Sequence, residues 1–432
     1  MKLNDKEQEF LKCFSSSFYK KVLNESLVSF KYKINKTEAK RLMVESYSNL
    51  INYNYNISTP QEYIYLIKNR YVSRIIPVFT VQDEAIYFYL CKQIEDDISV
   101  NRVEGTFGGW RIGNSIKLLE DEELEYVVNS YDPGLWLKNW KNFQKYIFTN
   151  LEKFNYKYAL KLDIANFYDS IDINILSRKL YKCCNKENYK FIELIIYLLK
   201  FWNKKFSCYN ENSVGIPQNE FGDQSRLLAN LYLNDYDVVM EKICLDNNCK
   251  YSRFADDQII LFDDEEQINN IMLICNEELR KIGLNLNAGK AHKFTHDELI
   301  KFYLFRELEK LDVGKYDEAA NDFFKLYDSG IEVRSDTFFR RCLTIGLNNF
   351  SLSIRNRIVS IITHEDFIIK CGVQHLSGVY KNLYLEEKQK FLDSLFLMFK
   401  KVKFNGFRYV VITFSKKNKL FDFMDKCVKE LI

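Results

Sequence analysis

The chain has 432 residues, 47% of them apolar, which is enough to bury a large core and argues against both a disordered chain and a small disulfide-stapled fold. Its 62 basic and 59 acidic residues leave a net charge of +3. That balance does not fit a bulk polyelectrolyte partner, so any nucleic-acid binding must come from local groups of charge.

The first residues, MKLNDKEQEF, lack the apolar run of a secretory signal. No later stretch reaches the ~18 apolar residues that cross a bilayer. We therefore expect a cytoplasmic protein without membrane contact. The eleven cysteines are odd in number and scattered, which predicts reduced thiols, and their spacing does not indicate a zinc site.

Along the chain, residues 1–69 are polar with apolar residues at helical spacing, which predicts a helical N-terminal extension. Between 158 and 294, short strand-forming runs alternate with helical segments, so an α+β region is expected there. From residue 301 to 432 helical spacing returns.

Three acidic residues stand where strand-forming runs end. Asp163 follows the run 158–162, and Asp256 and Asp257 lie between two such runs, at the expected turn of a hairpin. Unpaired carboxylates on buried strands are costly, and divalent metal would neutralise them. Two ions ~3.5 to 4 Å apart would stabilise both the attacking and the leaving oxygen of a phosphoryl transfer. The structural alternative is that Asp163 caps a helix and the doublet only forms a turn.

Four segments in this order resemble the palm motifs of reverse transcriptases. They are LDIANFYDSI (motif A), VGIPQNEFGDQSRLLANLYL (motif B), YSRFADDQIILF (motif C) and IGLNLNAGKAHKF (motif D). Two upstream blocks, RIIPVFTVQDEAIYFYL and FGGWRIGNS, are similar to the fingers of that family. The resemblance implies an α+β right-hand polymerase fold. Fingers and palm would occupy residues 70–300, and a helical thumb or C-terminal RNA-binding region residues 301–432.

The resemblance also implies catalytic roles. Asp163, Asp256 and Asp257 would be the catalytic acids and would bind two Mg²⁺ ions, with Ile164 as a further metal ligand. Lys290 of motif D would assist the leaving pyrophosphate as an acid or as a positive charge. A solvated surface lysine is the alternative for Lys290.

Five residues are expected to bind substrate. Tyr168 would lie against the sugar, exclude a 2′-hydroxyl and so favour deoxynucleotides, although a core tyrosine is the alternative. Gln218 would lie along the nascent base pair. Arg111 would contact the triphosphate, because a guanidinium binds phosphate through two hydrogen bonds. Ile164 and Phe254 complete the set.

Motif B departs from the family pattern. Asn219 stands where the family usually has glycine after Pro-Gln, and residues 220–224 lengthen the turn. Nucleotide or template positioning is therefore expected to be unusual, and Ser225 is only provisionally placed at the start of the following helix.

A basic, aromatic segment lies near the C-terminus. Residues 394–421 contain seven Lys and Arg and no Asp or Glu, and the aromatic residues Phe399, Phe404, Phe407, Tyr409 and Phe414 are interleaved with the basic ones. Basic side chains neutralise phosphates and aromatic rings stack on unpaired bases, so an RNA-docking surface is one interpretation. A solvated helix face is the other, and residues 138–145 allow the same two interpretations.

Within the family, the sequence is most similar to bacterial defence-associated enzymes of the unknown-group and abortive-infection class, with the stand-alone class 2 type preferred. That resemblance implies antiphage defence, a partner structured noncoding RNA as template, dNTPs as substrates and a DNA product. Three alternatives remain open: a retron-type enzyme, a template-independent protein-primed polymerase, and an inactive RNA-binding scaffold. The priming group and the oligomeric state also remain open.

Overall fold

The computed structural model describes residues 3–14, 18–19, 34–67, 72–112, 133–203, 214–218 and 223–431. These residues form two compact units. The first unit holds the described residues up to Glu62 together with Pro77–His296, and the second holds Tyr63–Ile76 and the residues from Asp297 onward. In the part of the chain that the structure describes, no helix is both long and apolar enough to cross a membrane.

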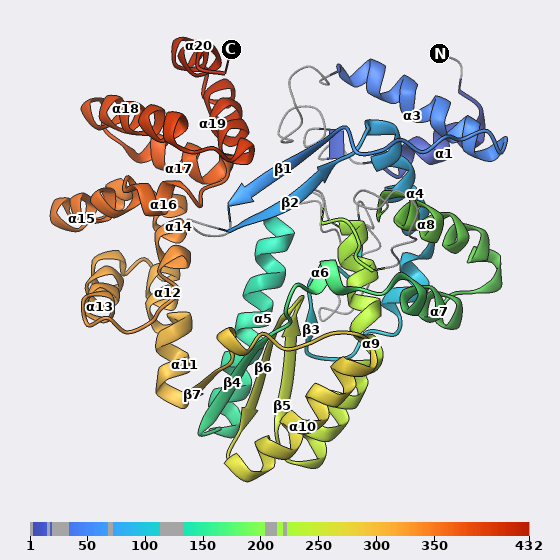
Figure 1. Ribbon diagram of the computed structural model, residues 1–432. Coiled ribbons are helices and arrows are strands. Elements are labelled where there is room, and N and C mark those ends of the chain that lie inside the picture. The colour runs from blue at the N-terminus through green and yellow to red at the C-terminus, as the bar shows by residue number, and fades with distance from the viewer. Residues whose placement is uncertain are drawn as a thin grey trace. The chain divides into compact units, whose positions relative to one another are not determined.

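The first unit combines helices with one sheet (Figure 1). Its elements are α1 (Asp5–Lys12), α3 (Lys36–Ile51), α4 (Val81–Ser99), β3 (Thr106–Phe107), α5 (Pro133–Phe154), β4 (Tyr158–Asp163), α6 (Phe167–Ser170), α7 (Ile173–Cys183), the 3₁₀ helix η4 (Lys186–Asn188), α8 (Tyr189–Trp202), α9 (Asp223–Asp246), β5 (Lys250–Phe254), β6 (Asp257–Phe262), α10 (Glu265–Lys281), the 3₁₀ helix η6 (Ala288–Lys290) and β7 (His292–Thr295).

The sheet of this unit has the strand order β3-β5-β6-β4-β7, and only the short β3 pairs in parallel. Strands β5 and β6 are buried along nearly their whole length. Their runs of apolar residues suit strands in the middle of a sheet that is covered on both faces. The predicted α+β class with a mainly antiparallel sheet is confirmed.

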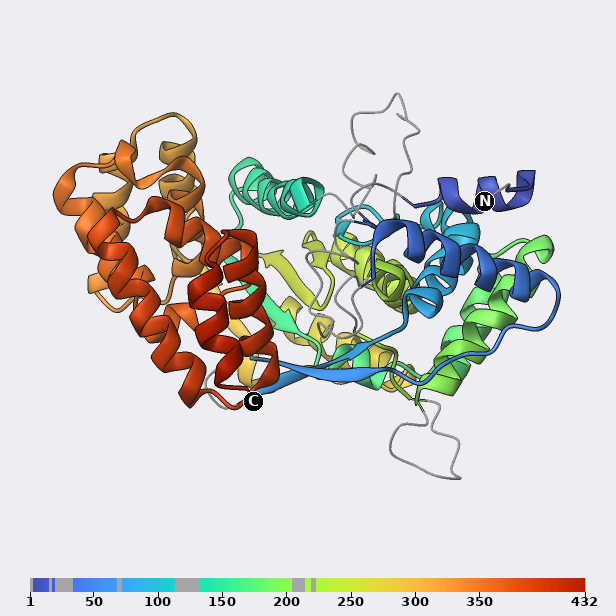
Figure 2. The same cartoon turned by 90° about the horizontal axis from the view of Figure 1, so that it is seen from above.

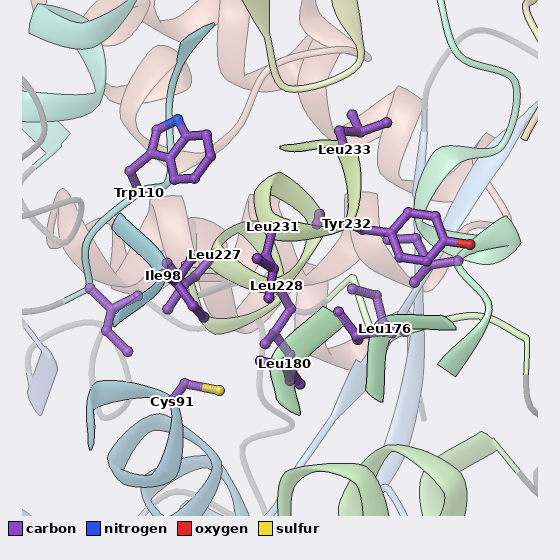
Figure 3. Packing of buried hydrophobic residues seen from close by; sticks show 14 of the residues in the cluster. Cys91, Ile98, Trp110, Leu176, Leu180, Leu227, Leu228, Leu231, Tyr232 and Leu233 are labelled. Carbon is purple, nitrogen blue, oxygen red and sulfur yellow. The ribbon is translucent and has the colours of Figure 1, made fainter. Parts of the chain in front are cut away.

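Apolar side chains of five helices form much of the core beside this sheet. Leu176 and Leu180 of α7 lie one helical turn apart and face Leu228 of α9, whereas Leu227 of α9 lies beside Ile98 of α4 (Figure 3). Helix α9 is buried on most of its surface between residues 224 and 233, as expected for a central helix. Helices α3 and α8 pack on α4, which completes the core (Figure 2).

The second unit is mostly helical. It contains a two-stranded sheet of β1 (Glu62–Ile67) and β2 (Ser73–Val78), whose outer ends belong to the first unit. The remaining elements are α11 (His296–Tyr303), α12 (Phe305–Asp312), α13 (Tyr316–Asp328), α14 (Ser335–Ile345), the 3₁₀ helix η7 (Leu347–Asn349), α15 (Leu352–Ile362), α16 (Glu365–Ile368), α17 (Val373–Asn382), α18 (Leu385–Lys401), α19 (Asn405–Lys417) and α20 (Phe421–Lys429).

Helix α19 begins directly on the edge of β1. The Asn405 side chain accepts a hydrogen bond from the Tyr65 amide at 2.9 Å and donates one to the Tyr63 carbonyl at 3.0 Å. Gly406 lies so close to the strand that a Cβ atom there would be 2.5 Å from the Tyr65 carbonyl oxygen. The contact satisfies backbone groups that an edge strand would otherwise expose, and it requires glycine at position 406.

We therefore expect Gly406→Ala to destabilise the second unit by about 1 to 3 kcal/mol, the usual cost of forcing an extra methyl group into a packed contact. Thermal melting monitored by circular dichroism measures this loss. Gly372→Ala is the matched control, because nothing lies within 4 Å of the position its Cβ would take. Equal melting temperatures for the two variants would contradict the contact.

Candidate active site

The three acids meet at one end of the sheet. Asp163 is the last residue of β4 and is the direct antiparallel partner of Asp257, the first residue of β6. Directly opposed residues have Cα atoms roughly 4.5 to 5.5 Å apart and side chains on the same face. The Ile164 amide donates to the Asp256 carbonyl at 3.3 Å, which brings the third acid to the same place. Opposed like charges destabilise a sheet, so this pairing is unfavourable without a cation.

The structural alternative for Asp163 does not hold, because other residues cap the helices that follow. Asn166 is the N-cap of α6, and the Asp172 side chain caps α7. The doublet does form a tight turn, as expected, with Ala255 and Asp256 between β5 and β6. Ala255 has φ 55°, in the left-handed region that alanine seldom adopts, so the turn must be held by its surroundings.

Positive and polar groups surround the acids. The Lys290 ammonium donates to Asp163 Oδ1 at 2.8 Å, and Asn287 Nδ2 donates to Oδ2 at 3.1 Å. On the neighbouring acid, Lys161 Nζ lies 3.3 Å from Asp257 Oδ1. Asp163 is only 5% exposed. The three carboxylates and two lysines leave one net negative charge at the end of the sheet.

This donor set fits a divalent cation. Carboxylate oxygens and a backbone carbonyl such as that of Ile164 are the hard ligands that Mg²⁺ prefers. Within the described ranges, no three His, Cys, Asp or Glu side chains form a metal site by themselves. Asp163, Asp256 and Asp257 would therefore hold a cation together with oxygens of the substrate, which is usual for Mg²⁺ bound to phosphates.

A small hollow of about 10 Å³ lies next to the acidic turn. Its lining residues come from the motif A, B and C segments and from the glycine loop after β3, and they are Gly108, Phe167, Tyr168, Arg226, Ala229, Asn230 and Ala255. Tyr168 is thus half-buried at the wall of a hollow rather than enclosed in the core. A wall that includes Ala255 places the hollow directly beside Asp256.

The first part of the motif B loop is fixed next to Tyr168. The Ile216 amide donates to the Tyr168 carbonyl at 2.9 Å, and the Gly215 amide donates to the Ile171 carbonyl at 2.7 Å. Gln218 follows two residues later and is half-buried. Residues 219–222, which carry the departure from the family pattern, lie outside the described residues. Ser225 is described and is buried within α9, where its hydroxyl lies 3.1 Å from the Tyr87 hydroxyl.

The structure places the other expected substrate contacts differently. Arg111 forms ion pairs with Asp96 and, at 3.9 Å, with Glu95, both on α4. The Phe254 ring is 5% exposed and packs against Trp140, with ring centroids 4.9 Å apart. The Ile164 side chain is buried, so only its backbone can face a ligand.

Sequence reasoning did not identify a buried ion pair behind the turn. Arg253 and Asp237 have fully buried side chains and are 2.5 Å apart. Arg253 also donates to the Asn230 side chain and to the Ala255 carbonyl, both at 2.9 Å. The available signal was an arginine inside the strand-forming run YSRFA, two residues before the turn.

The C-terminal basic segment 394–421 consists of the end of α18, all of α19 and the first residue of α20. Phe399, Phe407 and Phe414 are at most 3% exposed, so these three rings are not available to stack on bases, whereas Phe404 and Tyr409 are half-buried. Lys400 and Lys401 form ion pairs with Glu430 and Glu365, at 3.1 and 3.7 Å. The segment 138–145 behaves similarly, because Phe143 is buried and Trp140 packs on Phe254.

Comparison with known families agrees with this site. Residues 110–312 match the family described as "Reverse transcriptase (RNA-dependent DNA polymerase)". The match contains Asp163, Asp256, Asp257 and Lys290, so the candidate site lies within the residues that resemble this family.

The individual proteins that resemble this chain match it at 30% identity or less. The chain is 30% identical over 105 residues to the Retron Ec83 reverse transcriptase of Escherichia coli, which is 23% of this chain and 30% of that protein. The chain therefore matches less than a third of the length of this relative. Apo telomerase from Candida tropicalis, truncated from the C-terminal domain, aligns with 14% identity and a TM-score of 0.36, over 58% of this chain and 54% of that one. Telomerase from Candida albicans, in complex with a TWJ fragment of telomeric RNA, aligns with 12% identity and the same TM-score, over 89% and 68%.

The Lys290 ammonium lies where a cation would neutralise Asp163. We expect Lys290→Gln to strengthen Mg²⁺ binding by about two- to fivefold, because a half-exposed ion pair contributes up to ~1 kcal/mol and would no longer compete with the metal. The Mg²⁺-dependent rise in melting temperature measures this affinity. Lys293→Gln is the control, since Lys293 is a surface lysine paired with Glu265. Weaker Mg²⁺ binding by Lys290→Gln alone would show that the lysine does not compete for the site.

Proposed function

We propose that this protein is an RNA-directed DNA polymerase that acts by two-metal nucleotidyl transfer. The observation that carries the proposal is the register of β4 and β6, which sets Asp163 opposite Asp257 and next to Asp256. The reverse transcriptase family match over residues 110–312 supports it. The reaction would be attack of a primer 3′-hydroxyl, or a protein hydroxyl, on the α-phosphate of a dNTP, with release of pyrophosphate.

The acids and Lys290 would have different roles in this reaction. Asp163, Asp256 and Asp257, with the Ile164 carbonyl, would hold two Mg²⁺ ions, which when bound stabilise the charge on the attacking and leaving oxygens. Lys290 is 2.8 Å from Asp163 and would move to the pyrophosphate once the carboxylate is neutralised. Most of the rate enhancement would come from positioning and charge, because phosphoryl transfer requires little covalent chemistry from the protein.

The nucleotide would lie against the small hollow beside the turn. Tyr168 at its wall would exclude a 2′-hydroxyl and select deoxynucleotides. Gln218 would lie along the new base pair, since its loop is bonded to the Tyr168 backbone through Ile216. Arg111 would contact the triphosphate only after exchanging its carboxylate partners on α4, and Phe254 would act by supporting the turn from the core.

The test of catalysis is the double variant Asp256→Ala with Asp257→Ala. We expect it to lose dNTP incorporation by at least about a thousandfold, because phosphoryl transfer depends on the charges that these acids position. Primer extension on an RNA template measures incorporation. The fold should persist, because removing opposed carboxylates relieves repulsion in the sheet.

The chain offers a matched control in a second acidic doublet. Asp263→Ala with Asp264→Ala removes a hydrogen bond to the Lys157 amide and the N-cap of α10. Loss of a cap costs about 1 kcal/mol, so this variant should be less stable but still active. Synthesis by the folded 256/257 variant, at the level of this control, would refute the polymerase assignment.

The finer assignment is to bacterial antiphage defence with a structured noncoding RNA as template. The similarity of the motifs to those of the defence-associated class supports it. A retron-type enzyme is the second candidate, favoured by the 105-residue match to the Retron Ec83 reverse transcriptase. A template-independent protein-primed polymerase and an inactive RNA-binding scaffold are the remaining alternatives.

Sequencing the RNA and DNA that copurify with the protein separates these alternatives. We expect one enriched transcript together with DNA complementary to it, since a dedicated template leaves its copy in the product. DNA without a complementary RNA would indicate untemplated addition, and RNA without DNA would indicate a scaffold.

A further inference from the structure

Arg253 lies directly behind the acidic turn, and its guanidinium makes four hydrogen bonds although the side chain is fully buried. Two go to Asp237 of α9, at 2.8 Å from Nε and 2.5 Å from Nη2. The other two leave from Nη1, to the Asn230 side chain and to the carbonyl of Ala255. One planar group thus joins a central helix to the turn that carries Asp256.

The Arg253 guanidinium stays charged inside the core. Burial alone lowers the pKa of the Arg253 guanidinium, but the Asp237 carboxylate outweighs it, so the pKa is raised overall. Asp237 also accepts a hydrogen bond from the Tyr251 hydroxyl at 2.8 Å. Buried ion pairs add little stability compared with apolar residues of the same size, so stability alone does not account for this one.

The hydrogen bond from Arg253 to the Ala255 carbonyl indicates another role. Ala255 has φ 55°, a conformation that alanine seldom adopts without support. The Arg253 Nη1 atom lies 2.9 Å from its carbonyl oxygen, which fixes the orientation of the peptide that leads into Asp256. The turn is therefore held from behind by a rigid group.

The same guanidinium reaches the wall of the hollow. Asn230 accepts from Arg253 through its oxygen and donates through its nitrogen to the carbonyl of Gly108. Asn230, Gly108 and Ala255 all line the hollow. One buried group therefore fixes both the acidic turn and the loop that faces it across the hollow.

We propose that Arg253 is a positioning residue that holds the Ala255–Asp256 turn in its metal-binding conformation. Through Asn230 it also sets the position of Gly108, in the loop after β3, at the wall of the hollow. The proposal deepens the polymerase function proposed above and rests on it for the identity of the ligands. Arg253 touches no reacting atom; it acts through the backbone of the turn.

The test uses the double variant Arg253→Met with Asp237→Asn in the full chain. It removes both buried charges together, so the core keeps its charge balance, and the new amide side chain on α9 retains an oxygen for the Tyr251 hydroxyl. We expect a folded protein in which the Mg²⁺ concentration that gives half of the melting-temperature shift is about 10- to 100-fold higher, the usual effect of losing an outer-shell partner of a metal ligand. Amide hydrogen exchange across residues 254–258 should also become faster.

Two further variants complete the design. Arg355→Met with Glu387→Gln removes another ion pair with a buried arginine, 2.6 Å long in the second unit, and should change neither readout at the turn. Arg253→Lys keeps the charge but has a single nitrogen in place of the planar fork, and it should also weaken Mg²⁺ binding. If the first double variant does not fold, this single variant carries the test.

The outcomes separate the two proposals. A folded Arg253 variant with wild-type Mg²⁺ binding and wild-type exchange at 254–258 overturns the positioning role, whatever the activity. If the wild-type protein incorporates no dNTP, the polymerase function is contradicted. If the Arg253 variants nevertheless weaken Mg²⁺ binding and speed exchange at 254–258, the positioning role of Arg253 remains supported.

Discussion

The antiparallel pairing of β4 with β6 is the constraint on which the site depends. Side chains alternate between the faces of a strand, so a slip of one residue would turn Asp163 away from Asp257. The register is fixed by buried pairs further along the same strands, such as Ala159 with Leu261. The chemistry at the end of the sheet is therefore specified by apolar packing in its middle, and the two cannot be varied independently.

The acids themselves oppose that packing. Three carboxylates at the end of two neighbouring strands repel one another, and the structure offsets this with separate groups rather than one. Lys290 and Asn287 bind Asp163, and Lys161 approaches Asp257. All of these lie beside the carboxylates, whereas Arg253 acts from the core side. Repulsion among the carboxylates lowers the stability of the folded protein, which is common at functional sites.

The sequence predicted what is local and missed what depends on distant partners. The hairpin with Asp256 at its turn was predictable, because two strand-forming runs flank a short acidic stretch. The meeting of Asp163 with the doublet was predicted only through the order of the motifs. The packing of residues 394–421 was not predicted although its signal was present, since Phe407, Val411 and Phe414 recur at helical spacing and form a buried face. The partners of Arg253 and Arg111 lie on separate helices, which composition and spacing do not identify.

The glycine loop after β3 shows how closely the walls of the hollow are specified. Gly109 has φ 69°, and a Cβ atom there would be 2.6 Å from the Cβ atom of Arg226 on α9. Gly108 has φ 81° and faces the ring of Phe254. Buried Trp110 then fixes the loop in the core. Backbone packed this closely against a helix and a hairpin has little room to move, so the shape of the hollow follows from the core rather than from mobile surface side chains.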